Sequence, residues 1–109
     1  EAARAGIRSA EANLANIRAS VQVRAANAVT NVQSATTRVE ALERSAIPEA
    51  TEALRLSRLA YIQGRASLVE LLDAQSAYRE AQAALIDARL AQALATAELG
   101  RVAAQQDPQ

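Results

Sequence analysis

The stretch from Tyr61 to Gln75 is the only place where the helical pattern of this chain stops and restarts without a proline. Gly64 can adopt a positive φ at no steric cost, so it can end a helix that arrives from the N-terminal side. Ser67, followed three positions later by Glu70, has the pattern of a capping box, which begins a new helix. A short break of this kind between two long helical segments predicts a sharp reversal of the chain.

Apolar residues recur at steps of three and four on both sides of this break, as the seam between two packed helices requires. In the first arm, two steps of four follow each other through Ile17, Val21 and Ala25, a stutter that locally relaxes supercoiling. Alternatively, Ala25 and Arg24 exchange places at a loosely packed position. In the second arm, Gln92 interrupts an otherwise regular heptad pattern. The predicted seam residues are Ile7, Ala10, Leu14, Ile17, Val21, Ala25, Ala28, Val32, Ala35, Val39, Leu42 and Ala46, then Leu71, Ala74, Tyr78, Ala81, Leu85, Ala88, Gln92, Ala95, Leu99 and Val102.

Alanine accounts for roughly a quarter of the 109 residues, while Phe, Trp, Met and Cys are absent. Because alanine favours helices but fills little core volume, this composition predicts long helices packed along thin seams. We therefore predict an all-α fold, a long antiparallel two-helix coiled-coil hairpin that forms a single domain over residues 1–109. Its first arm is expected at 1–62, its tip at 63–66 and its second arm at 67–106. Because the pattern is already running at Glu1, we expect a fragment of a larger protein.

The two predicted arms differ in length. At about 1.5 Å per residue, the first arm reaches ~90 Å and the second ~60 Å. Folding about Gly64 then places Gln105 near Gln22 or Val23. Gly100 and Pro108 near the chain end predict that the second helix frays after about Val102. The apolar residues left without a partner are Ile7, Leu14 and Ile17, so we expect another chain or another part of the larger protein to cover them.

Pro48 interrupts the first arm. A proline inside a helix removes one hydrogen bond and clashes with the preceding turn, at a cost of ~3 kcal/mol if the helix runs straight. Either the helix kinks at Pro48, or a second helix begins there with Glu49 favourably placed near its positive end. We expect the kink, because Ala46 and Ile47 are poor caps and the apolar pattern resumes at once.

Composition argues against several classes of function. Twelve arginines balance twelve acidic residues, so no electrostatic reason favours nucleic acid or an anionic membrane surface as a partner. Without histidine and cysteine, the chain lacks the usual general base and the soft ligands of transition metals. No segment approaches the ~18 uncharged apolar residues of a membrane-spanning helix, so we expect no span in this segment.

One pair of carboxylates has a spacing that acid–base catalysis can use. Glu70 and Asp73 are three residues apart on one helical face, but no nucleophile, suitable base or pocket accompanies them in the sequence. A capping box explains Glu70, and a favourable interaction with the helix N-terminus explains Asp73. We therefore predict that the chain is not an enzyme and holds no cofactor or metal.

The tip resembles the C-terminal periplasmic hairpin of outer membrane efflux channels of the TolC type. The channels serving resistance-nodulation-division pumps, including exporters of heavy-metal cations, are the most similar. The resemblance covers nearly the whole chain and is strongest at the tip. Its residues are Tyr61, Gly64, Ser67, Leu68, Glu70, Leu71, Leu72, Asp73, Ala74 and Gln75, preceded by Ile47-Pro48-Glu49-Ala50 and followed by Leu85-Ile86-Asp87-Ala88-Arg89.

This resemblance implies a trimer in which each protomer contributes tandem hairpins to a hollow helical barrel in the periplasm of a Gram-negative cell. The hairpin tips would close the barrel and meet a periplasmic adaptor protein, which joins the channel to an inner-membrane pump for drugs or metal cations. Carboxylates lining such a pore would favour cations. Since this segment has no His, Cys or Met, it would be a conduit, with selection made in the pump.

Carried over by position, the resemblance assigns roles to seven residues. Some members have a gate arginine two positions after the glycine, where this chain has Ala66. Arg65 is adjacent but is expected to point elsewhere on the turn. The assigned residues are Tyr61, Glu70 and Asp73 at the gate or constriction, and Gly64, Arg65, Ala66 and Ser67 at the adaptor-docking tip.

Two other interpretations are weighed against the channel. The coiled-coil hairpin of the adaptor itself also reverses through a Gly and Ser tip, but that family carries an arginine and a leucine where this chain has Leu56 and Ala60. The other alternative is a generic dimerising coiled coil without a transport role, which only the zipper pattern favours.

Overall fold

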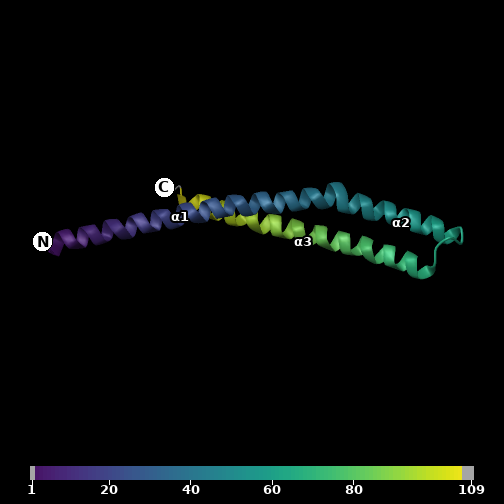
Figure 1. Ribbon diagram of the computed structural model, residues 1–109. Helices are drawn as coiled ribbons and strands as arrows, with labels where there is room; N and C mark the ends of the chain where they lie inside the picture. The colour runs from purple at the N-terminus through teal and green to yellow at the C-terminus, as the bar shows by residue number, and fades with distance from the viewer. Residues whose placement is uncertain (1, 107–109) are drawn as a thin grey trace. The chain divides into compact units, whose positions relative to one another are not determined.

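The computed structural model describes residues 2–106, which are helical except for a turn at residues 63–67 (Figure 1). Helix α1 (Ala2–Ala41) continues into a π-helical turn, η1 (Leu42–Ala46), and then into α2 (Ile47–Ile62). After the turn, α3 (Leu68–Gln106) runs to the end of the described range. No strand occurs within residues 2–106, so the predicted all-α class is confirmed.

The described residues form two compact units. The hairpin unit comprises residues 34–93, and the terminal unit comprises residues 2–33 together with 94–106. In the hairpin unit, α2 and the first half of α3 lie side by side and are joined by the turn (Figure 1). Two contacts pair the first arm with α3: Thr36 of α1 with Gln92, and Glu43 of η1 with Arg89. The residue number falls on one side as it rises on the other, so the two segments run in opposite directions.

Burial in the hairpin unit follows the predicted seam. Val39 and Ala88 of the predicted seam are buried, as is Leu54 in the apolar pattern that resumes after Pro48, all at 2–7% exposure. Gln92, the predicted interruption, is half-buried, and its Nε2 donates to Thr36 Oγ1 at 3.2 Å. The other half-buried residues on the predicted seam of this unit are Ala35, Leu42, Ala46, Leu71, Ala74, Tyr78, Ala81 and Leu85.

In the terminal unit, Ala28 and Val102 are each 3% exposed. Ala25 is half-buried whereas Arg24 is exposed, so Ala25 and not Arg24 occupies the seam. In the described range α3 continues as a helix through Gly100 to Gln106, so the fraying expected after Val102 stays a prediction; Pro108 lies outside that range. The residues expected to lack a partner are 48–60% exposed: Ile7, Leu14 and Ile17.

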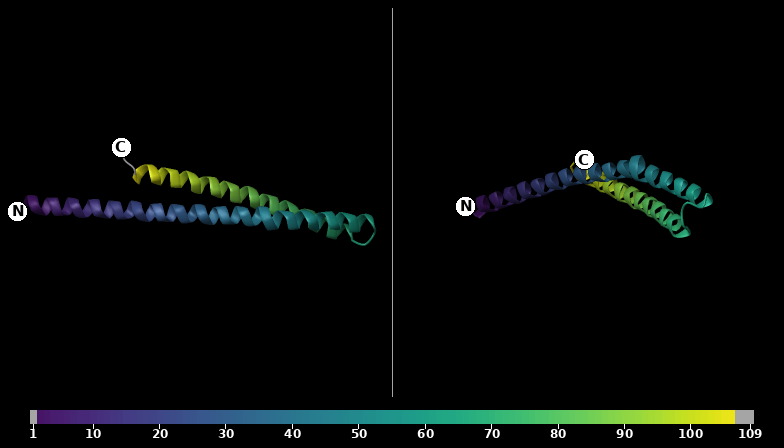
Figure 2. Two further views of the ribbon diagram at one scale, coloured as in Figure 1. Left: turned by 90° about the horizontal axis from the view of Figure 1, so that it is seen from above. Right: turned by 45° about the vertical axis from the view of Figure 1, so that its right-hand side comes forward.

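Pro48 neither stops the first arm nor starts a capped helix. Ala46 keeps αR angles and makes no side-chain cap, and the Ile47 N–H donates to the Leu42 carbonyl five residues back. In a regular α-helix the Pro48 ring would collide with the Arg44 carbonyl. A π-helical turn just before the proline widens the backbone there and relieves the collision. The helix axis changes direction at η1 (Figure 2, right), as the expected kink requires.

The π-helical turn also adds one residue to the seam. Ala46 and Ile47 are both half-buried. Before the turn the seam runs through Val39, Leu42 and Ala46, and after it the pattern restarts one residue later, from Ile47 through Ala50 to Leu54. Since a π-helical turn contains one residue more than the α-helical turn it replaces, both halves of the first arm keep their apolar side toward α3.

This offset predicts an unusual tolerance to deletion. In a Pro48→Ala background, removing Ala46 should turn η1 into a regular α-helical turn and leave the seam continuous. We expect the free energy of unfolding to change by less than about 1 kcal/mol, because no buried apolar group is uncovered. Urea unfolding followed by circular dichroism measures the change.

Deletion of Ala53 in the same background is the matched control. It rotates Leu54 away from α3 and should cost about 2–5 kcal/mol, the range for losing a buried leucine. Equal losses from the two deletions would contradict the assignment of η1 as a one-residue insertion.

Candidate functional site at the hairpin tip

The first half of the tip is a helix ending built from backbone groups. The Arg65 N–H donates to the Ala60 carbonyl at 2.8 Å, and the Gly64 N–H donates to the Tyr61 carbonyl at 3.0 Å. Together these two bonds form a Schellman motif, which needs a left-handed residue after the helix. Gly64 supplies it with φ of 75°, the one positive φ in the described chain. The predicted role of Gly64 as helix terminator is therefore confirmed.

The second half of the tip is the predicted capping box. The Ser67 Oγ accepts a hydrogen bond from the Glu70 N–H at 3.1 Å, and the Ser67 N–H donates to Glu70 Oε2 at 3.0 Å. One carboxylate oxygen of Glu70 is therefore occupied by the cap. Asp73, one turn further along α3, is exposed and forms no ion pair among residues 2–106.

The residues predicted to dock a partner are accessible. Gly64, Arg65 and Ser67 are exposed, and Ala66 is half-buried. A Cβ added at Gly64 would meet no atom within 4 Å. Tyr61, the predicted gate residue, is 42% exposed, so the isolated hairpin leaves its ring open to a neighbour.

Large apolar side chains also surround the turn, and the sequence prediction missed them. Ile62 is 80% exposed, Val69 65%, Leu68 53% and Leu72 49%. An exposed apolar group of this kind is typical of a surface that binds a partner. The signal was present in the sequence, because all four residues are large and apolar yet fall outside the seam positions.

Charge is distributed unequally around α3. Asp73, Glu80 and Asp87 are exposed and recur every seven residues, so they follow one face of α3 at spacings of about 10 Å. We call these three residues the acidic stripe. Arg79 is not part of this stripe, and it lines a groove together with Arg58 of α2. The exposed carboxylates of the stripe and the arginines of the groove are therefore separate groups of charge in the hairpin unit.

No three acidic side chains gather closely enough to hold a metal ion within residues 2–106. In the same range, no helix combines the length and hydropathy that crossing a membrane requires.

Comparison with known proteins gave no assignment. No family model matches the chain, and neither a curated protein nor a solved structure matches it significantly.

The capping box predicts the effect of a substitution at Ser67. Ser67→Ala should lower the free energy of unfolding by about 1 kcal/mol, because the Glu70 N–H at the start of α3 loses its acceptor. Ser76→Ala, on the exposed side of the same helix, is the control and should be neutral or slightly stabilising. Chemical denaturation of both variants provides the measurement, and equal effects would argue against a capping role for Ser67.

Proposed function

We propose that this chain is a periplasmic helical-barrel hairpin of an outer membrane efflux channel, and that its tip forms the gate and docks the adaptor during export of drugs or metal cations. The observation that carries the proposal is the tip, a rigid Schellman turn and capping box that leave Gly64 open and surround it with exposed apolar side chains. The resemblance of residues 61–75 to TolC-type channels supplies the biological context.

The tip has the properties of a protein-docking element. Its backbone hydrogen bonds are satisfied locally, so a partner meets a preformed turn and little conformational entropy is lost on binding. The absence of a side chain at Gly64 allows close approach, while Ile62 and Val69 offer apolar area. In the proposed assembly, the periplasmic adaptor contacts Gly64, Arg65, Ala66 and Ser67, and the inner-membrane pump follows the adaptor.

The gate is proposed along the acidic stripe of α3. Asp73 begins the acidic stripe, which Glu80 and Asp87 extend for about 20 Å along α3. In a trimer, each of these carboxylates would contribute to a ring that attracts cations. Glu70 would help to line the same constriction with its second carboxylate oxygen, and Tyr61 would make closing contacts between tips.

The packing of the two arms fits a barrel wall. We infer an antiparallel coiled coil, because seam burial alternates by three and four residues and the Glu43–Arg89 ion pair bridges the flanks of the seam at 3.0 Å. The exposed Ile7, Leu14 and Ile17 require a cover, which neighbouring hairpins of a trimeric channel would provide. The same exposed residues favour a self-associating coiled coil without a transport role as a second candidate.

The proposal predicts a specific defect when Gly64 is enlarged. In the full channel, Gly64→Leu should abolish adaptor docking and efflux, because the side chain fills the approach to the turn. The arms should stay folded, because the positive φ costs a non-glycine residue about 1–2 kcal/mol, which strains the turn without removing contacts of the arms. Adaptor co-purification and substrate efflux are the readouts, and helicity reports folding.

Gly100→Leu is the matched control. Gly100 is also a glycine with no atom within 4 Å of an added Cβ, but it lies inside α3, far along the chain from the tip. We expect this variant to dock the adaptor and support efflux normally. Normal efflux in the Gly64→Leu channel would refute the docking role of the tip.

A further inference from the structure

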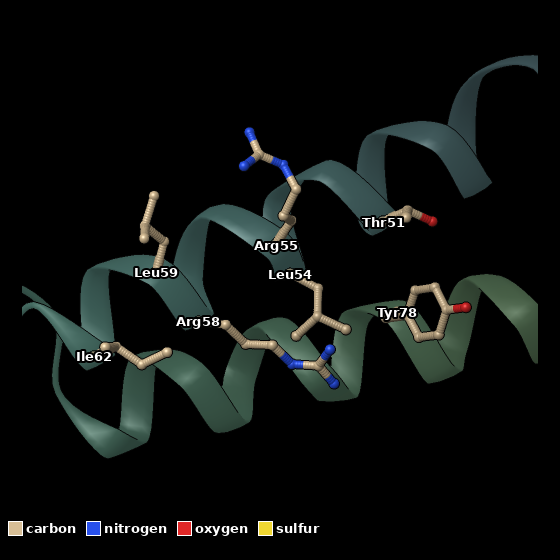
Figure 3. A pocket seen from close by; sticks show the side chains of 7 residues that line it. All are labelled: Thr51, Leu54, Arg55, Arg58, Leu59, Ile62 and Tyr78. Atoms are coloured by element: carbon tan, nitrogen blue, oxygen red, sulfur yellow. The ribbon is translucent and has the colours of Figure 1, made fainter.

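A groove runs along the hairpin unit behind the tip (Figure 3). It consists of two adjoining hollows of about 530 and 210 Å³, which share Leu54, Arg58 and Tyr78. Arg58 extends from α2 toward α3, and Leu54 points to the same side (Figure 3). Leu54 is 7% exposed, so the groove has an apolar floor between its polar walls.

The groove carries positive charge that the described chain does not neutralise. Arg58 and Arg79 form no ion pair within residues 2–106, and no acidic residue lines either hollow. Arg55, at the rim, is different, because it donates to both Glu52 oxygens at 2.6 and 3.0 Å. That hydrogen bond holds the pKa of the Glu52 carboxyl below its ordinary value. Two guanidinium groups, one from each helix, therefore remain available to a ligand.

The neutral side chains of the groove also favour a ligand that accepts hydrogen bonds. The Tyr78 hydroxyl accepts a hydrogen bond from Gln82 Nε2 at 2.8 Å, which leaves its own proton to donate. Gln75 adds a side-chain amide to the same hollow. Carboxylates accept hydrogen bonds from guanidinium groups in strong, charge-assisted pairs. Hydrogen-bond donors therefore predominate, and a carboxylate is the side chain that complements them.

The length of the groove points to a helix as the ligand. The lining residues of α2 run from Thr51 to Ile62, a rise of about 16 Å or three helical turns. Toward the tip, Leu59 is 44% and Ile62 80% exposed, so apolar side chains of the ligand would gain contacts there. A small molecule would remain largely open to water in such a shallow groove, whereas a helix covers its whole length.

We propose that this groove binds an amphipathic helix of another protein, which places a carboxylate between Arg58 and Arg79 and an apolar side chain against Leu59 and Ile62. Complementary charge would orient this helix and speed its association. The inference does not depend on the channel assignment, because it uses only contacts within the hairpin unit.

A designed peptide tests the proposal. The probe is a fluorescent 18-residue helical peptide with leucines and glutamates along one face, titrated into the full chain at low salt; the control peptide carries lysine in place of each glutamate. We expect the glutamate peptide to bind, binding to weaken with added salt, and the lysine peptide to bind at least tenfold more weakly. Absence of binding by the glutamate peptide, or equal binding of both peptides, would overturn the proposal.

Variants locate the binding site. Arg58→Gln combined with Arg79→Gln should lower the affinity for the glutamate peptide at least tenfold. Ile62→Ser should lower this affinity severalfold at any salt concentration. Arg38→Gln removes an exposed arginine of α1 outside the groove and should leave binding unchanged. Circular dichroism verifies that each variant retains its helicity. Wild-type affinity in the double variant, or an equal loss with Arg38→Gln, would place the peptide elsewhere.

Discussion

The thin seam between the two antiparallel segments is the constraint on which the hairpin unit depends. Apart from the half-buried Tyr78 and Gln92, small and aliphatic side chains fill it, and few residues of the described chain are buried. A seam of this kind holds the two segments together but distinguishes poorly between alternative registers of pairing, since alanines in neighbouring turns are interchangeable. The polar contact between Thr36 and Gln92 and the ion pair between Glu43 and Arg89 favour one pairing, as polar groups do at coiled-coil seams.

The tip completes this arrangement without using its exposed apolar side chains. The Schellman motif and the capping box satisfy backbone groups with backbone, serine and glutamate partners. Ile62 and Val69 therefore remain outside the packing, although each is large enough to contribute to a core. A turn that is stable without its apolar residues can present them to a partner, which links the local chemistry of the sequence to the proposed docking role.

The sequence predicted those features that depend on local chemistry or on periodicity. Gly64, the Ser67–Glu70 cap and the seam positions belong to this group, because each follows from spacing within a few turns. The π-helical turn was not predicted, since Pro48 is compatible with a kink, a new helix or a widened turn, and the choice depends on keeping both Ala46 and Ile47 against α3. The groove was also missed, because Arg58 and Arg79 line one hollow only when α2 and α3 lie side by side.

The acidic stripe and the arginines of the groove would attract different partners in the proposed assembly. None of the three carboxylates of the acidic stripe lines the groove, so in the proposed assembly the stripe can face a cation pathway while the groove meets a protein. A carboxylate of a partner would be repelled by Asp73 and Glu80 and attracted by Arg58 and Arg79. An acidic helix is therefore directed to the groove and kept away from the acidic stripe, and the net charge of zero conceals this polarity.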